Sequence, residues 1–214
     1  MSQPYKRGAH LPHPGKKDPS VKEFWVSNPW DIVSNGYNLS AFERNRTFYN
    51  LQGKGFVDLS YLTGADSDGD GRCVVAGDFR NCGQLDLVVR QSGGGAIMLL
   101  ENRFPKRHFL KVTLRGTQPG TNKLGIGSRL VAEVGGRQIV RELYPACSFV
   151  SQMPSMVHFG LGDASQVDRL TIRWPSGLVQ ELVDVPGDQH VVITEGADGS
   201  AALETVVPGR TILP

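Results

Sequence analysis

Short runs in which every second residue is apolar dominate the chain from residue 109 onward and restrict its fold. In the stretch RLTIRW, Leu170, Ile172 and Trp174 share one face, and the polar residues between them share the other. Because successive side chains of a strand point to opposite faces, this alternation predicts strands with one buried side. Strands are predicted at 109–116, 128–134, 137–143, 155–162, 167–174, 178–185 and 190–196, and several of them show this alternation. Their spacing is typical of a β-sandwich.

Shorter apolar runs precede this region and read as hairpins. RTFYNL (46–51) and FVDLS (56–60) flank the turn QGKG, and LDLVVR (85–90) and AIMLLEN (96–102) flank SGGG. A further strand is predicted at 72–79. Glycine-containing turns between short β-rich runs favour antiparallel hairpins.

The composition agrees with a turn-rich, all-β chain. Of 214 residues, 26 are glycine and 13 are proline, and no helical stretch stands out. The net charge of +2, from 23 basic and 21 acidic residues, is too balanced to indicate a nucleic-acid partner. Apolar runs are too short for a transmembrane segment, and no apolar signal peptide follows Met1.

These patterns divide the chain into three parts. We predict an extended N-terminal arm at 1–43, a β-hairpin segment at 44–104 and a β-sandwich-like domain at 105–214. The linker between the last two is short and holds Pro105, so we expect them to unfold together in one thermal transition.

In RQIVREL (137–143) Arg141 shares a face with Ile139 and Leu143, and this mixed pattern predicts an edge strand or a strand that is buried unevenly. Two interpretations of the arginines in this region stay open. Arg129, Arg141 and Arg173 either form a patch for an anionic ligand or make ordinary ion pairs on solvated strand faces.

The stretch DSDGDGR (66–72) begins like a calcium loop. Asp66, Asp68 and Asp70 supply carboxylates at alternating positions, and a glycine follows them. The positions that would close the coordination shell carry no carboxylate. Two hypotheses stay open: a flexible acidic turn without a tightly held ion, and weak Ca²⁺ binding by these three aspartates, with Asp78 or a carbonyl oxygen completing the shell.

No catalytic motif is present. The chain lacks a nucleophile elbow, a P-loop, a dinucleotide fingerprint and a zinc pattern, and its three cysteines match no redox spacing. Ser151, His158 and Asp163 are close in sequence, but such proximity does not define a triad. No catalytic residue is therefore assigned, and an enzyme is less favoured than the two non-enzymatic functions considered below.

Five motifs in the second part resemble the ASPIC/UnbV domain family. They are NKLGIGSRL (122–130), SFVSQ (148–152), VHFGLG (157–162), VDRLTIRWPSG (167–177) and Gln180. The segments before them are similar to blades of FG-GAP/VCBS-type β-propeller repeats. This resemblance implies a β-sandwich-like module fused to propeller-type repeats, in proteins that are extracellular or periplasmic. It ties no enzymatic activity to the family.

The resemblance also places a propeller-type calcium loop at DFRNCGQLD (78–86). Arg80 and Cys82 stand where the family has ligands, and neither a guanidinium nor a thiol suits calcium. We therefore expect a turn that keeps its shape without calcium. Asp78 and Asp86 would cap backbone N–H groups or pair with Arg80.

The resemblance and the absence of catalytic motifs favour a non-enzymatic binding or adhesion-type module for a protein or surface ligand. The alternative is an accessory subunit of a larger assembly, because the propeller-type segment holds too few strands to close on itself. Its open strand edges would then be covered by an assembly partner.

Overall fold

The computed structural model describes residues 44–67, 71–91, 96–148, 151–197 and 199–206. Strands make up 53% of these residues and helix 3%, in the single turn α2 (Ser60–Thr63) of the described chain, so the predicted all-β fold class is confirmed. In this part of the chain no helix has the length and apolar character needed to cross a bilayer.

The chain divides into two compact units. Of the described residues, those between 44 and 74 and between 88 and 100 form the first unit, and those at 75–87 and between 101 and 206 form the second. The turn between β3 (Gly71–Gly77) and β4 (Asp86–Gln91) therefore groups with the second unit. The predicted arm at 1–43 lies outside the described residues, and the predicted boundary near residue 105 stays a prediction.

In the first unit the predicted hairpin at 46–60 is present. β1 (Phe48–Asn50) pairs antiparallel with β2 (Phe56–Asp58), and Gly53 adopts a left-handed conformation in the turn between them. The two strands predicted for the second hairpin are neighbours, because β5 (Met98–Leu100) lies next to β4 in a three-stranded sheet of order β3-β4-β5.

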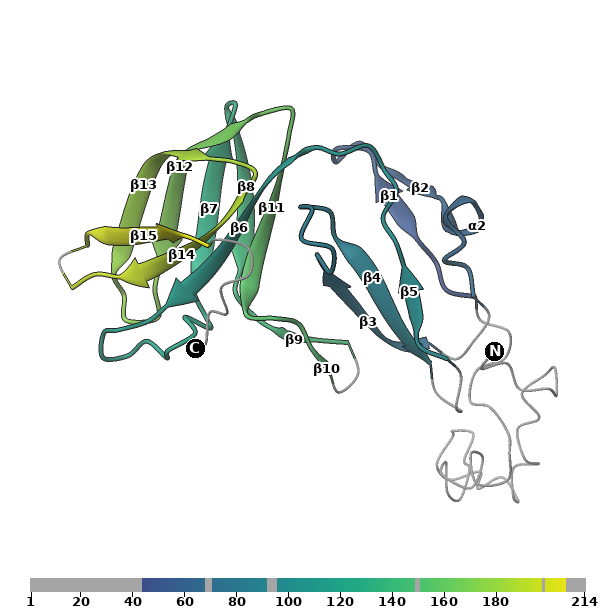
Figure 1. The fold of residues 1–214 in the computed structure, drawn as a ribbon, viewed down its shortest axis with the longest axis horizontal. Coiled ribbons are helices and arrows are strands. Elements are labelled where there is room, and N and C mark those ends of the chain that lie inside the picture. Colours follow the sequence, from purple (N-terminus) through teal and green to yellow (C-terminus); the bar gives the residue numbers. More distant parts are fainter. Residues whose placement is uncertain (1–43, 68–70, 92–95, 149–150, 198, 207–214) are drawn as a thin grey trace, which may run out of the picture. The chain divides into compact units, whose positions relative to one another are not determined.

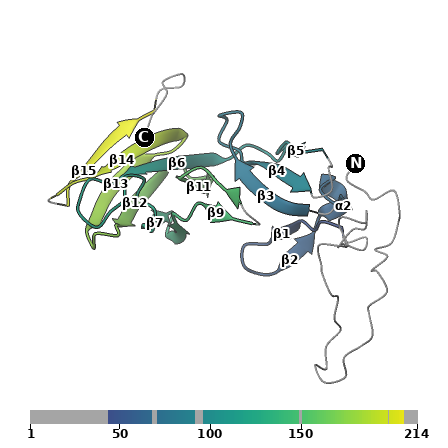
Figure 2. The same cartoon turned by 90° about the horizontal axis from the view of Figure 1, so that it is seen from below.

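The second unit contains two four-stranded sheets, which form the two layers seen in Figure 1 and, turned by 90°, in Figure 2. The sheet of order β11-β6-β14-β15 consists of β11 (Met156–Gly162), β6 (His108–Arg115), β14 (Gln189–Glu195) and β15 (Ala201–Thr205). The sheet of order β13-β12-β7-β8 consists of β13 (Val179–Pro186), β12 (Gln166–Arg173), β7 (Arg129–Val134) and β8 (Arg137–Glu142). A two-stranded pair, β9 (Ala146–Cys147) with β10 (Ser151–Gln152), lies between β8 and β11 in the sequence.

The inner faces of both sheets share one hydrophobic core, as expected for a sandwich. Leu170, Ile172 and Trp174 are all buried in it, which confirms the face predicted from their alternation. The other fully enclosed large side chains include Leu110, Leu130, Phe159, Leu161 and Ile193. Trp174 is thus a core residue.

β8 is an edge strand, which is one of the two alternatives predicted from its mixed pattern. It follows β7 through Gly135 and Gly136, which both have positive φ, so this two-residue turn matches the twist of the flanking strands. Arg141 lies opposite Leu130 on β7, whose side chain is in the core. Because directly opposed residues share a face, Arg141 lies on the inward side of the sheet edge.

One buried carboxylate, that of Glu195, connects the loop after β6 with the turn after β12. Glu195 accepts hydrogen bonds from the backbone N–H groups of Thr117 and Gln118 and from the hydroxyls of Thr121 and Ser176. Burial raises its pKa, but these hydrogen bonds outweigh that effect and leave the pKa below its ordinary value. Glu195 therefore joins the loop after β6 to the turn after β12.

Candidate functional site

Asp78 organises the turn between β3 and β4. Its Oδ1 accepts the N–H of Cys82 at 2.8 Å, and its Oδ2 accepts the N–H of Gly83 at 2.9 Å. Asn81 and Gly83 take positive φ values of 50° and 84°, which brings these N–H groups toward one carboxylate. The capping role predicted for Asp78 is thereby confirmed.

Two cations satisfy the carboxylates of this turn. Arg80 forms a two-pronged contact with Asp86 at 2.9 and 3.2 Å, as predicted, and also contacts Glu101 at 2.7 Å. Lys111 of β6 donates to Asp78 Oδ2 at 2.7 Å and to the side-chain oxygen of Asn81 at 3.3 Å. Both negative charges in the turn therefore have partners within the chain, and the expectation that it holds no calcium stays a prediction.

The acidic loop at 66–70 is described only in part. Asp66 forms an ion pair with Arg44 at 2.6 Å, whereas Asp68 and Asp70 lie outside the described residues. In the part of the chain that the structure covers, no group of three His, Cys, Asp or Glu side chains is arranged to hold a metal. Calcium binding by Asp66, Asp68 and Asp70 stays a prediction.

Lys111 lies between two histidines on the outer face of its sheet. It is directly opposite His158 of β11 and aligned with His190 of β14. Burial lowers the pKa of both histidines, and the charge of Lys111 lowers each further. Lys111 is 5% exposed, so this face carries a buried polar row instead of a solvated surface.

The turn packs closely on this face. His158 Nε2 donates to the carbonyl oxygen of Gly83 at 2.8 Å, and the His158 ring stacks on Phe109 with centroids 6.0 Å apart. A Cβ placed on Gly83 would lie 2.1 Å from the ring of Phe109. Glycine is required here for both the left-handed backbone and the close approach.

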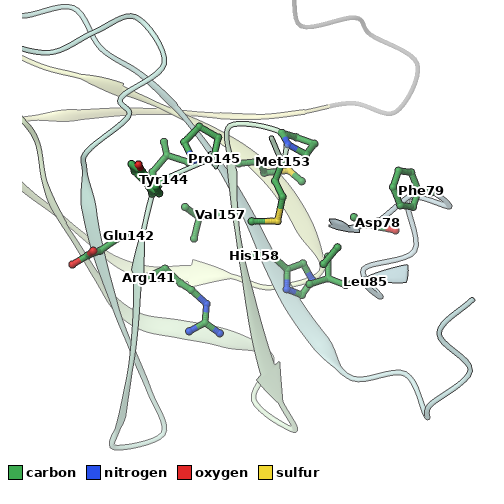
Figure 3. A pocket seen from close by; sticks show the side chains of 15 residues that line it. Asp78, Phe79, Leu85, Arg141, Glu142, Tyr144, Pro145, Met153, Val157 and His158 are labelled. Atoms are coloured by element: carbon green, nitrogen blue, oxygen red, sulfur yellow. The ribbon is translucent and has the colours of Figure 1, made fainter. Parts of the chain in front are cut away.

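Beside the turn lies a pocket of about 330 Å³, shown in Figure 3. Three segments far apart in sequence line it: the turn with the end of β3, the end of β8 with the residues after it, and the start of β11 with the residues before it. Most of the lining is apolar, with Leu85, Tyr144, Met153 and Pro154 as representatives. All of these residues belong to the second unit.

The polar side chains that line the pocket differ in whether they are already bonded within the chain. The Asp78 carboxylate is 1% exposed and already bonded to Lys111. Arg141 and His158 are other polar side chains of the lining; in Figure 3 they lie on either side of the β11 ribbon, while Glu142 points away from both. The charge of Arg141 is close enough to contribute to the lowered pKa of His158. The pocket thus offers a guanidinium and a neutral imidazole among apolar walls.

The three arginines considered as one patch do not form one. Arg129 lies opposite Arg173 and opposite Glu142, with its guanidinium 3.9 Å from the carboxylate. Because Arg141 takes the next position along β8, it lies on the other face of the sheet. Arg129 and Arg173 therefore belong to the solvated face, and Arg141 alone of the three lines the pocket.

Ser151, His158 and Asp163 make contacts with separate partners. Ser151 donates to the carbonyl of Cys147, His158 to the carbonyl of Gly83, and Asp163 pairs with Arg107. Their proximity in sequence does not correspond to a hydrogen-bonded triad.

Comparison with known proteins covers part of this site. The FG-GAP/VCBS resemblance predicted for 44–104 stays a prediction. No curated protein matches the chain. A family model matches the stretch of the chain at 116–200. This stretch includes β7 to β14 and contains Arg141, Met153 and His158, but it does not include the turn at 78–86. Residues 116–200 match the model of the ASPIC and UnbV family, which agrees with the resemblance carried by the five motifs.

Proposed function

We propose that the protein is a non-enzymatic binding module and that the pocket at the edge of the sandwich is its ligand site. The observation that carries this proposal is the composition of the pocket: its walls are mostly apolar, and the polar side chains of Arg141 and His158 are among the residues that line it. Small-molecule and side-chain sites in proteins have this composition, and their volumes begin at about 300 Å³.

The wall formed by the turn supports the proposal because it is already ordered. Asp78, Lys111 and His158 fix the turn through direct hydrogen bonds before any ligand arrives. A preformed wall lowers the entropic cost of binding, since fewer side chains must be immobilised by the ligand.

A fragment screen tests this function. We expect ligand-observed NMR on the full chain to find fragments that bind the wild type and lose binding in Met153→Trp, which fills the cavity. Met98→Trp is the matched control, because Met98 lies on β5 and does not line the pocket. A screen without hits, or hits that bind Met153→Trp equally well, would contradict the proposal.

The accessory-subunit alternative is favoured by one feature of the first unit. Several of its large apolar side chains are mostly exposed, including Phe48 at 57%, Phe56 at 68%, Tyr61 at 85% and Leu62 at 80%. Large contiguous apolar patches usually mark interaction surfaces. We expect light scattering to show a species heavier than one chain if this alternative holds, and a monomer at high concentration argues against it.

Two further proposals rest on the sequence alone. From the family resemblance we infer an extracellular or periplasmic location, which fractionation of the source cells would test. For calcium, we expect any rise in melting temperature that the ion causes to vanish in Asp68→Ala. It should persist in Asp86→Ala, because Asp86 is bonded to Arg80. The reverse result would assign the ion to the turn at 78–86.

A further inference from the structure

We propose that the pocket recognises a carboxylate that carries a neighbouring N–H group and an apolar side chain. The C-terminal residue of a peptide and an N-acyl amino acid both have this chemistry. The proposal rests on the function proposed above and specifies its ligand class.

Arg141 supplies the anchor for the carboxylate. The hydrogen bond the structure gives its guanidinium is to the carbonyl of the neighbouring Val140. Among the described residues no carboxylate forms an ion pair with it: Glu142 lies on the other face, and Asp78 is bonded to Lys111. Four N–H donors of a planar fork thus remain for a ligand, and this geometry matches the two oxygens of a carboxylate.

His158 supplies the acceptor for the N–H group. A carbonyl oxygen can only accept, so the bond to Gly83 places the imidazole hydrogen on Nε2. Burial, with the charges of Lys111 and Arg141, lowers the pKa of the ring, which is therefore neutral at pH 7. Its Nδ1 then carries a lone pair, and in the described residues no donor is bonded to it. A ligand amide can fill that position.

The walls favour an apolar side chain on the same ligand. Leu85, Met153 and Pro154 offer aliphatic or thioether surface, and Tyr144 adds an aromatic ring that is 69% exposed. Methionine adapts to ligands of different shape, and the tyrosine ring can cover an apolar group at the rim. The site therefore combines one charge, one acceptor and an apolar cavity.

Calorimetry on the full chain tests this ligand class with defined probes. We expect N-acetyl-L-leucine to bind and its carboxamide to bind at least tenfold more weakly, because the amide loses the charge-assisted contact. The N-methyl analogue of N-acetyl-L-leucine lacks the N–H and should bind at least fivefold more weakly. A tetrapeptide ending in leucine distinguishes the sources: tighter binding assigns a peptide C-terminus, and weaker binding assigns a free N-acyl amino acid.

Matched variants locate the contact. Arg141→Gln should weaken N-acetyl-L-leucine at least tenfold, and Arg141→Lys should have a smaller effect, whereas Arg137→Gln should leave binding unchanged. Arg137 begins the same strand but does not line the pocket. Equal binding of acid and carboxamide, or unchanged binding in Arg141→Gln, would overturn the proposal. If neither N-acetyl-L-leucine nor the tetrapeptide binds while other fragments occupy the pocket, the proposed ligand class is wrong but the proposed function stands. If no fragment binds, the proposed function is wrong as well.

Discussion

Replacing Lys111 by methionine tests whether the ion pair holds the turn to the sandwich. The side chains of Lys111 and Asp78 are 7% and 1% exposed, so the variant leaves a carboxylate buried beside two backbone N–H donors and no cation. Removing one partner of a buried ion pair typically costs about 3–5 kcal/mol. With a urea dependence of about 2 kcal/mol per molar, a loss of 3 kcal/mol lowers the unfolding midpoint by roughly 1.5 M.

The free energy of unfolding lost in Lys111→Met should be larger at neutral pH than in mild acid. In the wild type, burial raises the pKa of Asp78, but hydrogen bonds from Lys111 and the backbone outweigh it and hold the pKa below its ordinary value. Its stabilising contribution is therefore present at neutral pH and is lost as the pH falls through that lowered pKa. Without Lys111 the pKa of Asp78 rises, and protonation in mild acid removes the uncompensated charge. The difference between wild type and variant should be largest near pH 7 and should narrow toward pH 4.5.

Urea unfolding followed by tryptophan fluorescence measures this effect. In a background with Trp25→Phe and Trp30→Phe, Trp174 is the single remaining tryptophan and reports on the core of the second unit. Lys123→Met, at an exposed position of the same unit, is the control and should leave the midpoint unchanged. The reasoning would be refuted if Lys111→Met lowered the free energy of unfolding by less than about 1 kcal/mol. It would also be refuted if the difference in this free energy between wild type and variant stayed constant from pH 7 to pH 4.5.

Three further predictions concern the same unit. Gly83→Ala should lower the melting temperature by at least about 5 °C, and more than Gly177→Ala, which shares the left-handed backbone but has open space around it. Glu195→Gln should cost about 2 kcal/mol in urea unfolding at pH 7, with a smaller difference in acid, where the wild-type carboxylate is protonated. Because the pKa of His158 is lowered in the fold, the wild type should lose stability as the pH falls below about 6.5, and His158→Asn should lose less between pH 7.5 and 5.5 by calorimetry.

Most of the sandwich could be predicted from local pattern. The alternation around Ile172 identified a core strand, and the mixed face of 137–143 indicated an edge strand or an unevenly buried one. Local pattern does not specify which strands become neighbours, so the parallel pairing of β6 with β14 was not predicted. The short pair β9–β10 and the strand β15 were also missed, since two-residue strands and AALET carry little alternation.

The candidate site was predictable in one part only. The roles of Asp78 and Asp86 followed from the residues of one turn, because capping and pairing with Arg80 are local interactions. The contact of Lys111 with Asp78 spans 33 positions, and in the sequence Lys111 is simply one polar residue of an alternating strand. The pocket joins three distant segments, so its lining required the fold.

The face of the strand on which Arg141 lies was the sequence feature that related to the pocket. Arg141 shares a face with Ile139 and Leu143, and an inward charge at a sheet edge is also a common defence against edge-to-edge pairing. The two explanations make different predictions. An edge guard acts through its charge alone, so lysine should replace it fully and carboxylate probes should not bind. A ligand anchor needs the planar fork, so lysine should weaken binding while aggregation stays unchanged.

The site and the fold share residues, and this determines which variants are informative. His158 both holds Gly83 and lines the pocket, so its replacement changes binding and packing together. Lys111 acts on the pocket only through Asp78 and the turn. Arg141 is exposed and lies on an edge strand, so it is the polar lining residue whose loss leaves the buried network intact. Loss of binding in Arg141→Gln with an unchanged urea midpoint would therefore report on recognition, whereas loss in Lys111→Met with a lowered midpoint would report on the ordering of the wall.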